Sequence, residues 1–332
     1  MPEGVGAIFY GLGPIGREAA KLALKRGAVP VGAIDINPEI AGRDLAEVVN
    51  YGKGTGVLVS DDSACVLSMP ADVVLHCTSS SLGAVKGQIL DCVRHGLNVI
   101  SSSEELSYPF MHNREAADEI DAAAKKHGVT VLGTGVNPGF LMDSLVVKMT
   151  GLCEEVEGIK VERVVDAGKR RLPLQKKVGA GMEVEEFKRR VAEGTLGHAG
   201  TKESIAMIAD SLGWKLDRIE QTIEPMVAEK DLKTEFLQIK KGQATGIKQI
   251  GRGYRGGKEV ITLDLRMYVG AEEPKDAVYI EGKPTLNSIV HGGVHGDSAT
   301  IATLVNSIPS VIKAQPGLLT MKDIGHVSCW GK

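Results

Sequence analysis

The stretch Gly11-Leu12-Gly13-Pro14-Ile15-Gly16 decides the fold class of this chain. An apolar run at residues 5–10 precedes it, and a segment of helical composition at residues 17–26 follows it. A second apolar run, residues 29–36, contains Asp35, which lies 19 residues after the last glycine of the stretch. A strand, a glycine turn, a helix, a second strand and an acidic residue in this order are typical of a βαβ unit that binds a dinucleotide.

Each glycine of this motif has a physical role. Gly11 permits a tight turn, Gly13 lets a pyrophosphate approach the backbone, and Gly16 lets the helix pack closely on the strand. The pyrophosphate would lie at the helix N-terminus, where unpaired N–H groups and the helix dipole favour an anion. The residues predicted to contact it are Gly11, Leu12, Gly13, Pro14, Ile15 and Gly16.

The residues at and beyond the end of the second strand bear on the choice of cofactor. Asp35 would accept hydrogen bonds from the adenosine ribose, which favours NAD. Asn37 and Arg43 lie just beyond it and could accommodate a 2′-phosphate. We therefore expect NAD or NADP as the cofactor, with dual use left open.

Apolar runs and helical segments continue to alternate through the first half of the chain. Strands are expected at residues 72–77, 98–101 and 129–132, with helices at residues 82–95 and 114–127. This order predicts a doubly wound parallel sheet of the Rossmann type, with helices on both faces and ligands beyond the carboxyl ends of the strands. The predicted cofactor contacts in the loops at those ends are Cys77, Thr78, Ser79, Ser101 and Asn137.

The second half of the chain has a different pattern. Residues 156–165 and 260–269 alternate apolar and polar side chains, as half-exposed strands of a mixed or antiparallel sheet do. We expect a hairpin turn at residues 251–257 and a last helix at residues 298–314. The predicted domains are a dinucleotide-binding domain (1–145), a smaller α+β substrate domain (146–294), and a C-terminal helix and tail (295–332) that return to the first domain.

Composition limits the class of protein. Lys+Arg 39 against Asp+Glu 42 gives a net charge of −3, and only 4% of residues are aromatic, so neither nucleic-acid binding nor base stacking is expected. No apolar stretch is long enough to span a membrane, and we expect a cytoplasmic protein. The five cysteines are scattered, and His291 and His295 lack a third ligand, so no metal site is expected.

Four residues are candidates for the chemistry. Glu104 and Glu105 follow a strand end, where one carboxylate could act as a general base while the other forms a Ser-x-x-Glu capping box. Asn137, before Pro138, could direct its amide at the cofactor or substrate, or form a plain turn. His198 is either a site residue or a capping or core residue. No G-x-S-x-G motif and no paired Cys/His nucleophile context is visible, so hydride transfer fits better than hydrolysis.

A basic cluster follows the first alternating strand of the second half. It is either a solvated face or the partner of a substrate carboxylate, and Arg170 and Lys176 are its predicted substrate contacts. The few aromatic residues suggest that charge and hydrogen bonds hold the substrate, with Phe140 as the predicted aromatic contact.

Five segments are distinctive in combination. They are residues 11–16, 102–105, 133–143, 173–179 and 291–297. Together they resemble the 2,4-diaminopentanoate dehydrogenases and the related native amine dehydrogenases, and residues 133–143 and 173–179 carry the most specific part of the likeness. That family is similar in architecture to dihydrodipicolinate reductase, whose histidine-rich, lysine-containing catalytic stretch is not found here.

The resemblance implies an activity. It is NAD(P)-dependent oxidative deamination of an amine, such as 2,4-diaminopentanoate to 2-amino-4-oxopentanoate and ammonia, or the reverse reductive amination. It also implies that Glu104, in preference to Glu105, activates water or ammonia, and that the second domain forms a homodimer. A diamino acid and a simple amine both remain open as substrates. The rival functions are a reductase that needs no ammonia, similar to dihydrodipicolinate reductase, and a nucleotide-sensing Rossmann protein.

Overall fold

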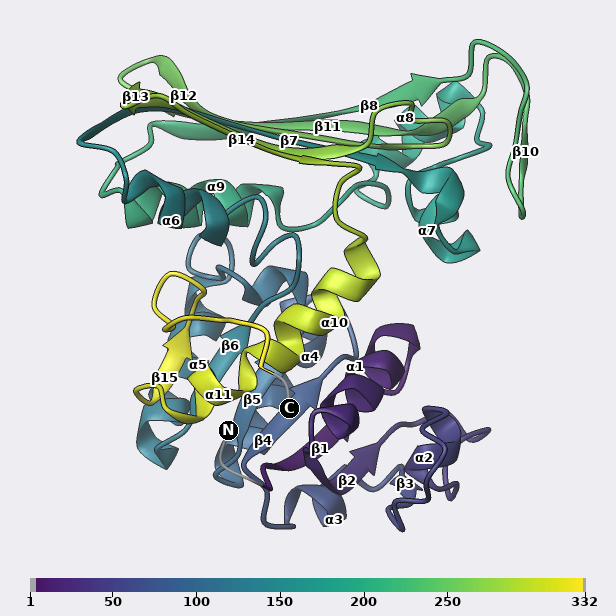
Figure 1. Ribbon diagram of the computed structural model, residues 1–332, viewed down its shortest axis with the longest axis vertical. Coiled ribbons are helices and arrows are strands. Elements are labelled where there is room, and N and C mark those ends of the chain that lie inside the picture. Colours follow the sequence, from purple (N-terminus) through teal and green to yellow (C-terminus); the bar gives the residue numbers. More distant parts are fainter. Residues whose placement is uncertain (1–3, 331–332) are drawn as a thin grey trace. The chain divides into compact units, whose positions relative to one another are not determined.

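The computed structural model describes residues 4–330, and the chain divides into two compact units (Figure 1). The first unit contains the chain up to Phe140 and again from His295 onward, and the second is Leu141–Val294. We expected domains to end at residues 145 and 294, and in the structure the units divide after Phe140 and after Val294. Residues 1–3 and 331–332 of the predicted domains lie outside the described residues.

The first unit is built on a seven-stranded sheet in the order β15-β6-β5-β4-β1-β2-β3. Every pair of neighbouring strands is parallel. The strands are β1 (Gly6–Tyr10), β2 (Val29–Ile34), β3 (Val59–Ser60), β4 (Val73–His76), β5 (Asn98–Ser101), β6 (Thr130–Gly133) and β15 (Gly317–Leu319). The order reverses between β1 and β4, and ligands of such sheets bind beyond the strand ends at this point.

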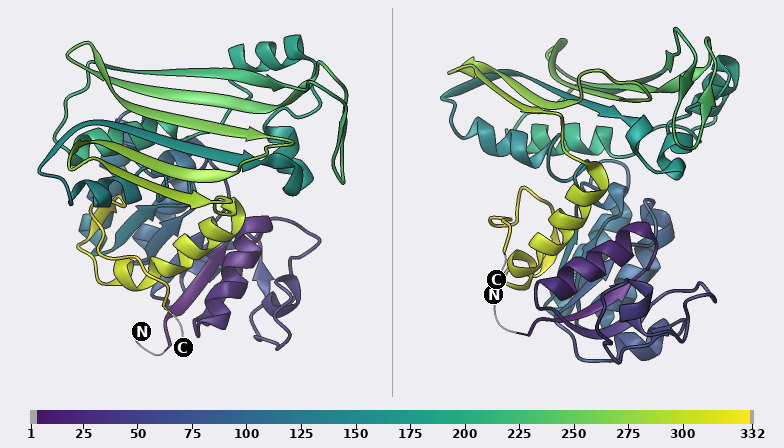
Figure 2. Two further views of the ribbon diagram at one scale, coloured as in Figure 1. Left: turned by 45° about the horizontal axis from the view of Figure 1, so that its top comes forward. Right: turned by 45° about the vertical axis from the view of Figure 1, so that its right-hand side comes forward.

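Helices cover both faces of this sheet (Figures 1 and 2). One face carries α1, α10 and α11, with α10 packed on α1, and the other carries α4 and α5. The helices are α1 (Pro14–Lys25), α2 (Leu45–Val48), α3 (Ser63–Leu67), α4 (Leu82–Arg94), the 3₁₀ turn η1 (Glu104–Leu106), α5 (Arg114–His127), α10 (Gly296–Asn306) and α11 (Ile308–Ile312). The predicted doubly wound Rossmann fold is confirmed.

The single helix expected at residues 298–314 is wrong, because the chain forms α10 and α11 with a break at Ser307. Pro309 has no N–H, so the carbonyl of Val305 cannot receive its regular helical hydrogen bond. That carbonyl instead accepts a hydrogen bond of 3.0 Å from the indole N–H of Trp330. The break in the helix therefore provides the acceptor that fastens the C-terminal tail.

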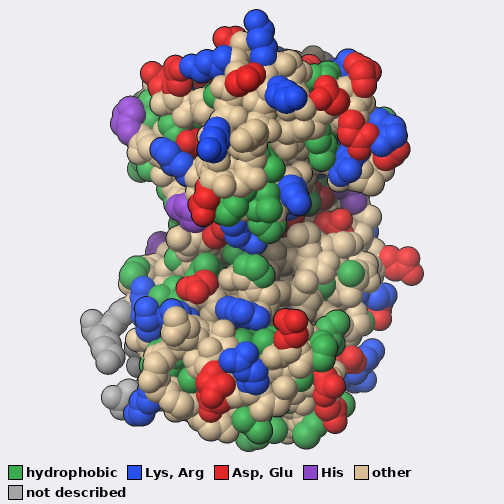
Figure 3. Space-filling model, turned by 90° about the vertical axis from the view of Figure 1, so that its right-hand side faces the viewer, with side chains coloured by type: hydrophobic (Ala, Val, Ile, Leu, Met, Phe, Trp, Pro, Cys, Tyr) green, Lys and Arg blue, Asp and Glu red, His purple; other side chains and the backbone are tan. Residues whose placement is uncertain are grey.

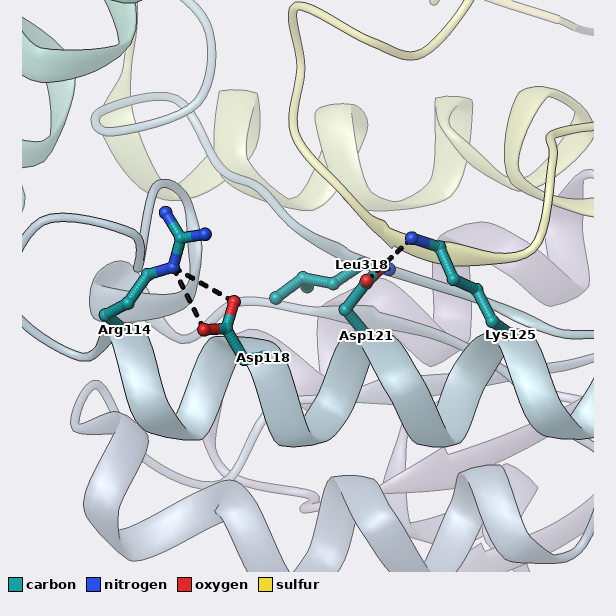
Figure 4. Close-up of polar contacts among 5 residues, drawn as sticks. All are labelled: Arg114, Asp118, Asp121, Lys125 and Leu318. Atoms are coloured by element: carbon teal, nitrogen blue, oxygen red, sulfur yellow. Dashed lines mark hydrogen bonds and ion pairs between the residues drawn. The ribbon is translucent and has the colours of Figure 1, made fainter.

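The edge strand β15, which the sequence did not predict, is attached by α5 (Figure 4). Asp121 of α5 accepts a hydrogen bond of 3.0 Å from the backbone N–H of Leu318 and pairs with Lys125 at 2.7 Å. One turn earlier in α5, Arg114 pairs with Asp118. A short edge strand has little pairing of its own, so this side-chain contact adds to its attachment.

The second unit is built on a six-stranded mixed sheet in the order β14-β13-β7-β12-β11-β8. Only β7 and β12 pair in parallel, and the other neighbours are antiparallel. The strands of this unit, with a separate hairpin of β9 and β10, are β7 (Glu155–Asp166), β8 (Arg218–Val227), β9 (Leu232–Lys233), β10 (Gln238–Ile239), β11 (Ala244–Arg255), β12 (Lys258–Tyr268), β13 (Lys275–Lys283) and β14 (Leu286–His291). The predicted α+β unit with a mixed sheet is confirmed.

Helices pack on one face of this sheet, as Figure 2 shows for α6 and α9. The helices are α6 (Ser144–Thr150), the 3₁₀ turn η2 (Ala167–Lys169), α7 (Leu172–Lys177), α8 (Val184–Ala192) and α9 (Thr201–Ser211). Their apolar side chains form one core with the sheet, in which Phe187 of α8 and Ile205 of α9 are fully buried. Strand β8 alternates exposed and half-buried residues, as expected for a strand with one solvated face.

The hairpin turn expected at residues 251–257 is wrong in extent. Gly251 and Gly253 lie inside β11, and only Gly256 and Gly257 form the turn, both with positive φ. A Cβ on Gly251 would lie 2.6 Å from Thr201 and 2.7 Å from Ile205, so this glycine makes room for α9 on the sheet.

Two further observations concern the surface and the helices. On the face drawn in Figure 3, acidic and basic side chains are intermixed, in keeping with the nearly balanced composition. Among residues 4–330, no helix has both the length and the apolar character that crossing a membrane requires.

Candidate active site

The turn between β1 and α1 contains two glycines that have no room for a side chain and one that has open space beside it. Gly11 has φ +89°, and a Cβ there would lie 2.7 Å from the carbonyl oxygen of Cys77. A Cβ on Gly16 would overlap the carbonyl oxygen of Gly11. A Cβ on Gly13, in contrast, would meet nothing within 4 Å. The protein's own packing explains the first two glycines, whereas the space beside Gly13 suits an approaching ligand.

The N-terminus of α1 has the electrostatic character of an anion site. Its N-cap residue, Gly13, offers no side-chain hydrogen bond, and the first turn contains no acidic residue. The partial positive charge of this helix end is therefore not neutralised locally, and it favours a pyrophosphate. The sequence-predicted contacts Leu12, Pro14 and Ile15 lie in the same turn.

Asp35 connects the glycine turn to the end of β2. Its Oδ2 accepts a hydrogen bond of 2.6 Å from Leu12 N, and its Oδ1 accepts one of 2.9 Å from Asn37 N. A carboxylate has about four lone-pair sites, so two remain for ribose hydroxyls. Arg43 is exposed and pairs loosely with Glu47 at 3.6 Å, so this guanidinium is not held in a rigid ion pair.

A buried histidine at the carboxyl end of β4 organises the centre of the first unit. His76 is fully buried, with Nδ1 3.0 Å from Ser101 Oγ and Nε2 2.8 Å from Gln88 Oε1. Because an amide oxygen only accepts, Nε2 carries the hydrogen and the Ser101 hydroxyl donates to Nδ1. Thr78 Oγ1 also donates to Gln88 Oε1, at 2.7 Å. Burial lowers the pKa of His76 to about 4, so its ring is neutral near pH 7.

The other cofactor candidates beyond β4 and β5 differ in accessibility. Ser101 is fully buried and Ser103 N donates to its hydroxyl, so this side chain makes its hydrogen bonds inside the protein. Thr78 and Ser79 are exposed. Cys77 is half-buried, and burial of its thiol raises its pKa to about 11, which keeps it protonated.

The two adjacent glutamates have different environments. Glu105 Oε2 accepts hydrogen bonds from Leu82 N at 2.8 Å and Ser81 Oγ at 3.3 Å, so it caps α4. The expected Ser-x-x-Glu capping box is wrong, because the N-cap residue of η1 is Ser103, which has Leu106 three positions later and donates its hydroxyl to Ser80 O. Glu104 Oε2 is shielded from solvent within the loop that follows β5.

The loop that carries Asn137 follows β6 and is tightly packed. The Asn137–Pro138 peptide bond is cis, and Asn137 is half-buried. A Cβ on Gly139 would lie 2.5 Å from Gly135 N, so the loop folds back on itself. The hydroxyl of Thr300 from α10 accepts a hydrogen bond of 3.2 Å from Val136 N, which shows that the returning C-terminal segment supports this loop.

The remaining candidates lie in or next to the second unit. Arg170 is buried, Lys176 is exposed, and Phe140, the last residue before this unit, is half-buried. His198 is half-buried, and its Nδ1 donates to Ala199 O at 2.6 Å. Its backbone is held by the buried amide of Gln249, which accepts from His198 N at 2.8 Å and donates to His198 O at 2.7 Å.

Several supporting residues were missed by sequence reasoning. They are His76, Gln88, Gln249 and Thr300. A histidine that ends the apolar run of residues 73–76 was a usable signal, because a buried polar side chain needs a partner. His295 is the N-cap residue of α10, and its Nδ1 accepts a hydrogen bond of 3.4 Å from Ser298 N. Among residues 4–330, no group of three or more potential ligands could hold a metal ion.

Comparison with known proteins identifies the family. A family model described as the 2,4-diaminopentanoate dehydrogenase C-terminal domain matches residues 140–331. A protein named 2,4-diaminopentanoate dehydrogenase from Acetoanaerobium sticklandii is 39% identical over 330 residues, covering 97% of this chain and 94% of that protein. This chain belongs to the 2,4-diaminopentanoate dehydrogenase family.

More distant relatives of this family member agree with the assignment. An amine dehydrogenase from Streptomyces virginiae is 24% identical, with 96% of each chain covered. The solved structure of an amine dehydrogenase from Mycobacterium smegmatis matches with a TM-score of 0.86 and 26% identity, covering 98% of this chain and 97% of that one. The chain is therefore an oxidoreductase, and its dehydrogenase relatives together with its Rossmann fold imply a nicotinamide cofactor.

Burial of neutral His76 predicts a dependence of stability on pH. The unfolded chain binds a proton at this residue below about pH 6.5, whereas the folded chain does so only near pH 4. Its stabilising contribution is complete above pH 6.5 and is lost as pH falls toward 4. The free energy of unfolding, measured by urea titration, should fall between pH 7 and pH 4.5 in the parent chain. In His76→Gln this fall should be smaller by about 2 to 3 kcal/mol. His127→Gln, at an exposed position, is the control, and equal losses in all three proteins would contradict the prediction.

Proposed function

We propose that this chain catalyses the NAD(P)-dependent oxidative deamination of a small amine or amino acid, and the reverse reductive amination. The likeness to proteins named 2,4-diaminopentanoate dehydrogenase and amine dehydrogenase supports this reaction. The observation that carries it is the carboxylate oxygen Oε2 of Glu104, which is shielded from solvent on the loop after β5, in a unit whose glycine turn suits a dinucleotide. Glu105 caps α4, and Glu104 is the carboxylate of the pair that we assign to proton transfer, as the family resemblance implies.

The chemistry follows from these residues. When bound, the nicotinamide would take a hydride from the amine-bearing carbon of the substrate. The negative charge of Glu104 would stabilise the resulting iminium, and its carboxylate would take a proton from the attacking water. Addition of that water and loss of ammonia leave a ketone. The N-terminus of α1 would hold the pyrophosphate and Asp35 the ribose, while Asn137 would orient the carboxamide or the substrate.

We propose a diamino acid as the substrate class, with 2,4-diaminopentanoate the example that the named relative supplies. Such a substrate carries a carboxylate, for which a guanidinium or ammonium is the suitable partner. Arg170 and Lys176 are the proposed partners, with Phe140 as an apolar contact and His198 as a further polar group. A simple amine lacks the carboxylate and would gain nothing from these cations.

The first test of this function uses a panel of carbonyl compounds with both cofactors. NAD(P)H oxidation should require a carbonyl substrate and ammonia together. Glu104→Ala should lower kcat by roughly 10² to 10⁴-fold, the usual contribution of a general base, while cofactor binding persists by fluorescence titration. Oxidation without ammonia would indicate a reductase instead, and cofactor binding without turnover on any compound would indicate a nucleotide sensor.

The second test concerns the cofactor. We propose that Asp35 favours NAD, because its carboxylate accepts from ribose hydroxyls and repels a 2′-phosphate, while the loosely paired Arg43 leaves NADP usable. Asp35→Asn should shift the ratio of kcat/KM for NADPH over NADH upward by about tenfold, which corresponds to about 1.4 kcal/mol. An unchanged ratio would remove Asp35 from the choice of cofactor.

We also propose a homodimer formed through the second unit, as the resemblance implies. Its sheet carries the exposed side chains Ile289 and Val290 on the edge strand β14, which a partner could cover. Light scattering on the purified protein should give twice the chain mass of 35.2 kDa, and a monomer would refute the proposal. The cytoplasmic location stays a prediction.

A further inference from the structure

The side chain of Glu105 spans two loops of the first unit. It leaves the loop after β5 and reaches the N-terminus of α4, where Leu82 N donates to its Oε2 at 2.8 Å and Ser81 Oγ at 3.3 Å. Ser81 is the N-cap residue of α4 and makes no cap bond with its own side chain. The helix is therefore capped by a residue that lies 23 positions further along the chain.

Backbone and hydroxyl contacts reinforce this junction. Ser103 Oγ donates to Ser80 O at 3.0 Å, and Glu105 N donates to the same oxygen at 3.2 Å. Helix α4 has 13 residues and no acidic residue in its first turn, so its N-terminus attracts the negative charge of Glu105. The carboxylate is both a hydrogen-bond acceptor and the counter-charge of this helix end.

Glu104 depends on this junction because its own turn is short. The turn η1 has only three residues, too few to be stable through its internal hydrogen bonds. On its far side, Ser107 donates to Glu104 O from both N at 3.2 Å and Oγ at 2.8 Å. The backbone of Leu106 packs on Gly133, where a Cβ would lie 2.5 Å from Leu106 O. The loop is thus attached to the start of α4 by Ser103 immediately before Glu104 and by Glu105 immediately after it, and close packing holds Leu106 beyond them.

We propose that Glu105 is a positioning residue, which docks the loop on α4 and thereby sets the place of the Glu104 carboxylate. The proposal rests on the proposed function, in which Glu104 transfers the proton. Glu105 itself transfers no proton in the reaction, because its contribution comes from accepting the two hydrogen bonds of α4. A neutral acceptor of the same shape should therefore replace it.

The experiment compares two substitutions at Glu105. Glu105→Ala removes the acceptor and should lower kcat on the order of 10²-fold, with KM and cofactor affinity little changed, because a misplaced catalytic group slows the chemical step. Glu105→Gln keeps an amide oxygen opposite Leu82 N and should recover most of that loss. Ser103→Ala, which removes one hydroxyl bond of the junction, should act in the same direction with a smaller effect and serves if Glu105→Ala fails to fold.

The control is a carboxylate with an equivalent bond elsewhere in the unit. Asp121 lies on α5 and accepts from Leu318 N of β15 at 3.0 Å, as Figure 4 shows. Asp121→Ala should lower the melting temperature by about as much as Glu105→Ala does, but it should leave kcat unchanged.

Three outcomes would overturn the assignment of Glu105. Equal losses of kcat in Glu105→Ala and Asp121→Ala would reduce Glu105 to an ordinary helix cap. A Glu105→Gln variant as slow as Glu105→Ala would refute the claim that Glu105 acts by accepting the two hydrogen bonds of α4. An inactive Glu104→Gln beside a fully active Glu105→Ala would refute the positioning role alone, whereas an active Glu104→Gln would refute the proposed function of Glu104.

Discussion

The close approach of the glycine turn to the end of β4 is the constraint on which the first unit depends. No side chain fits at Gly11 or Gly16, because backbone atoms of Cys77 and of the turn itself already occupy that space. This contact brings β1, α1 and β4 together at the point where the strand order reverses. The uncapped end of α1 and the open position at Gly13 belong to the same turn, so the place suited to an anion lies directly beside this packing.

Much of this first unit was predictable, because its strands and helices have strong local signals. The helix at residues 114–127 and the strand at residues 98–101 match α5 and β5 residue for residue. The incorrect predictions, in both units, have physical causes. Gly251 and Gly253 resemble turn glycines in sequence, but they provide room for α9, which only the tertiary structure reveals. The break before Pro309 was readable from the sequence, whereas a three-residue strand such as β15 is too short to give a periodic pattern.

Some residues of the candidate site were predictable from the sequence, and others were not. The glycine motif and Asp35 carry their own spacing signal, and both lie where the motif implies. Adjacent glutamates carry no such signal, and the distinction between Glu104 and Glu105 comes from a bond to a helix far away in sequence. His76 was missed because a single histidine in an apolar run does not disclose its partners, Ser101 and Gln88, which come from another strand and a helix. The roles of Arg170, Lys176 and His198 remain predictions.

The hydrogen bond from Trp330 to the broken end of α10 has a consequence for how the molecule can be observed. The chain contains two tryptophans, and the other, Trp214, lies in the second unit beside the guanidinium of Arg255. Each unit therefore carries one tryptophan with a guanidinium over its ring, Arg26 over Trp330 and Arg255 over Trp214, and Trp330 in addition bonds its indole N–H to a carbonyl. Removing either indole leaves a tryptophan emission that comes from one unit, so the chain contains its own means of following the two units separately.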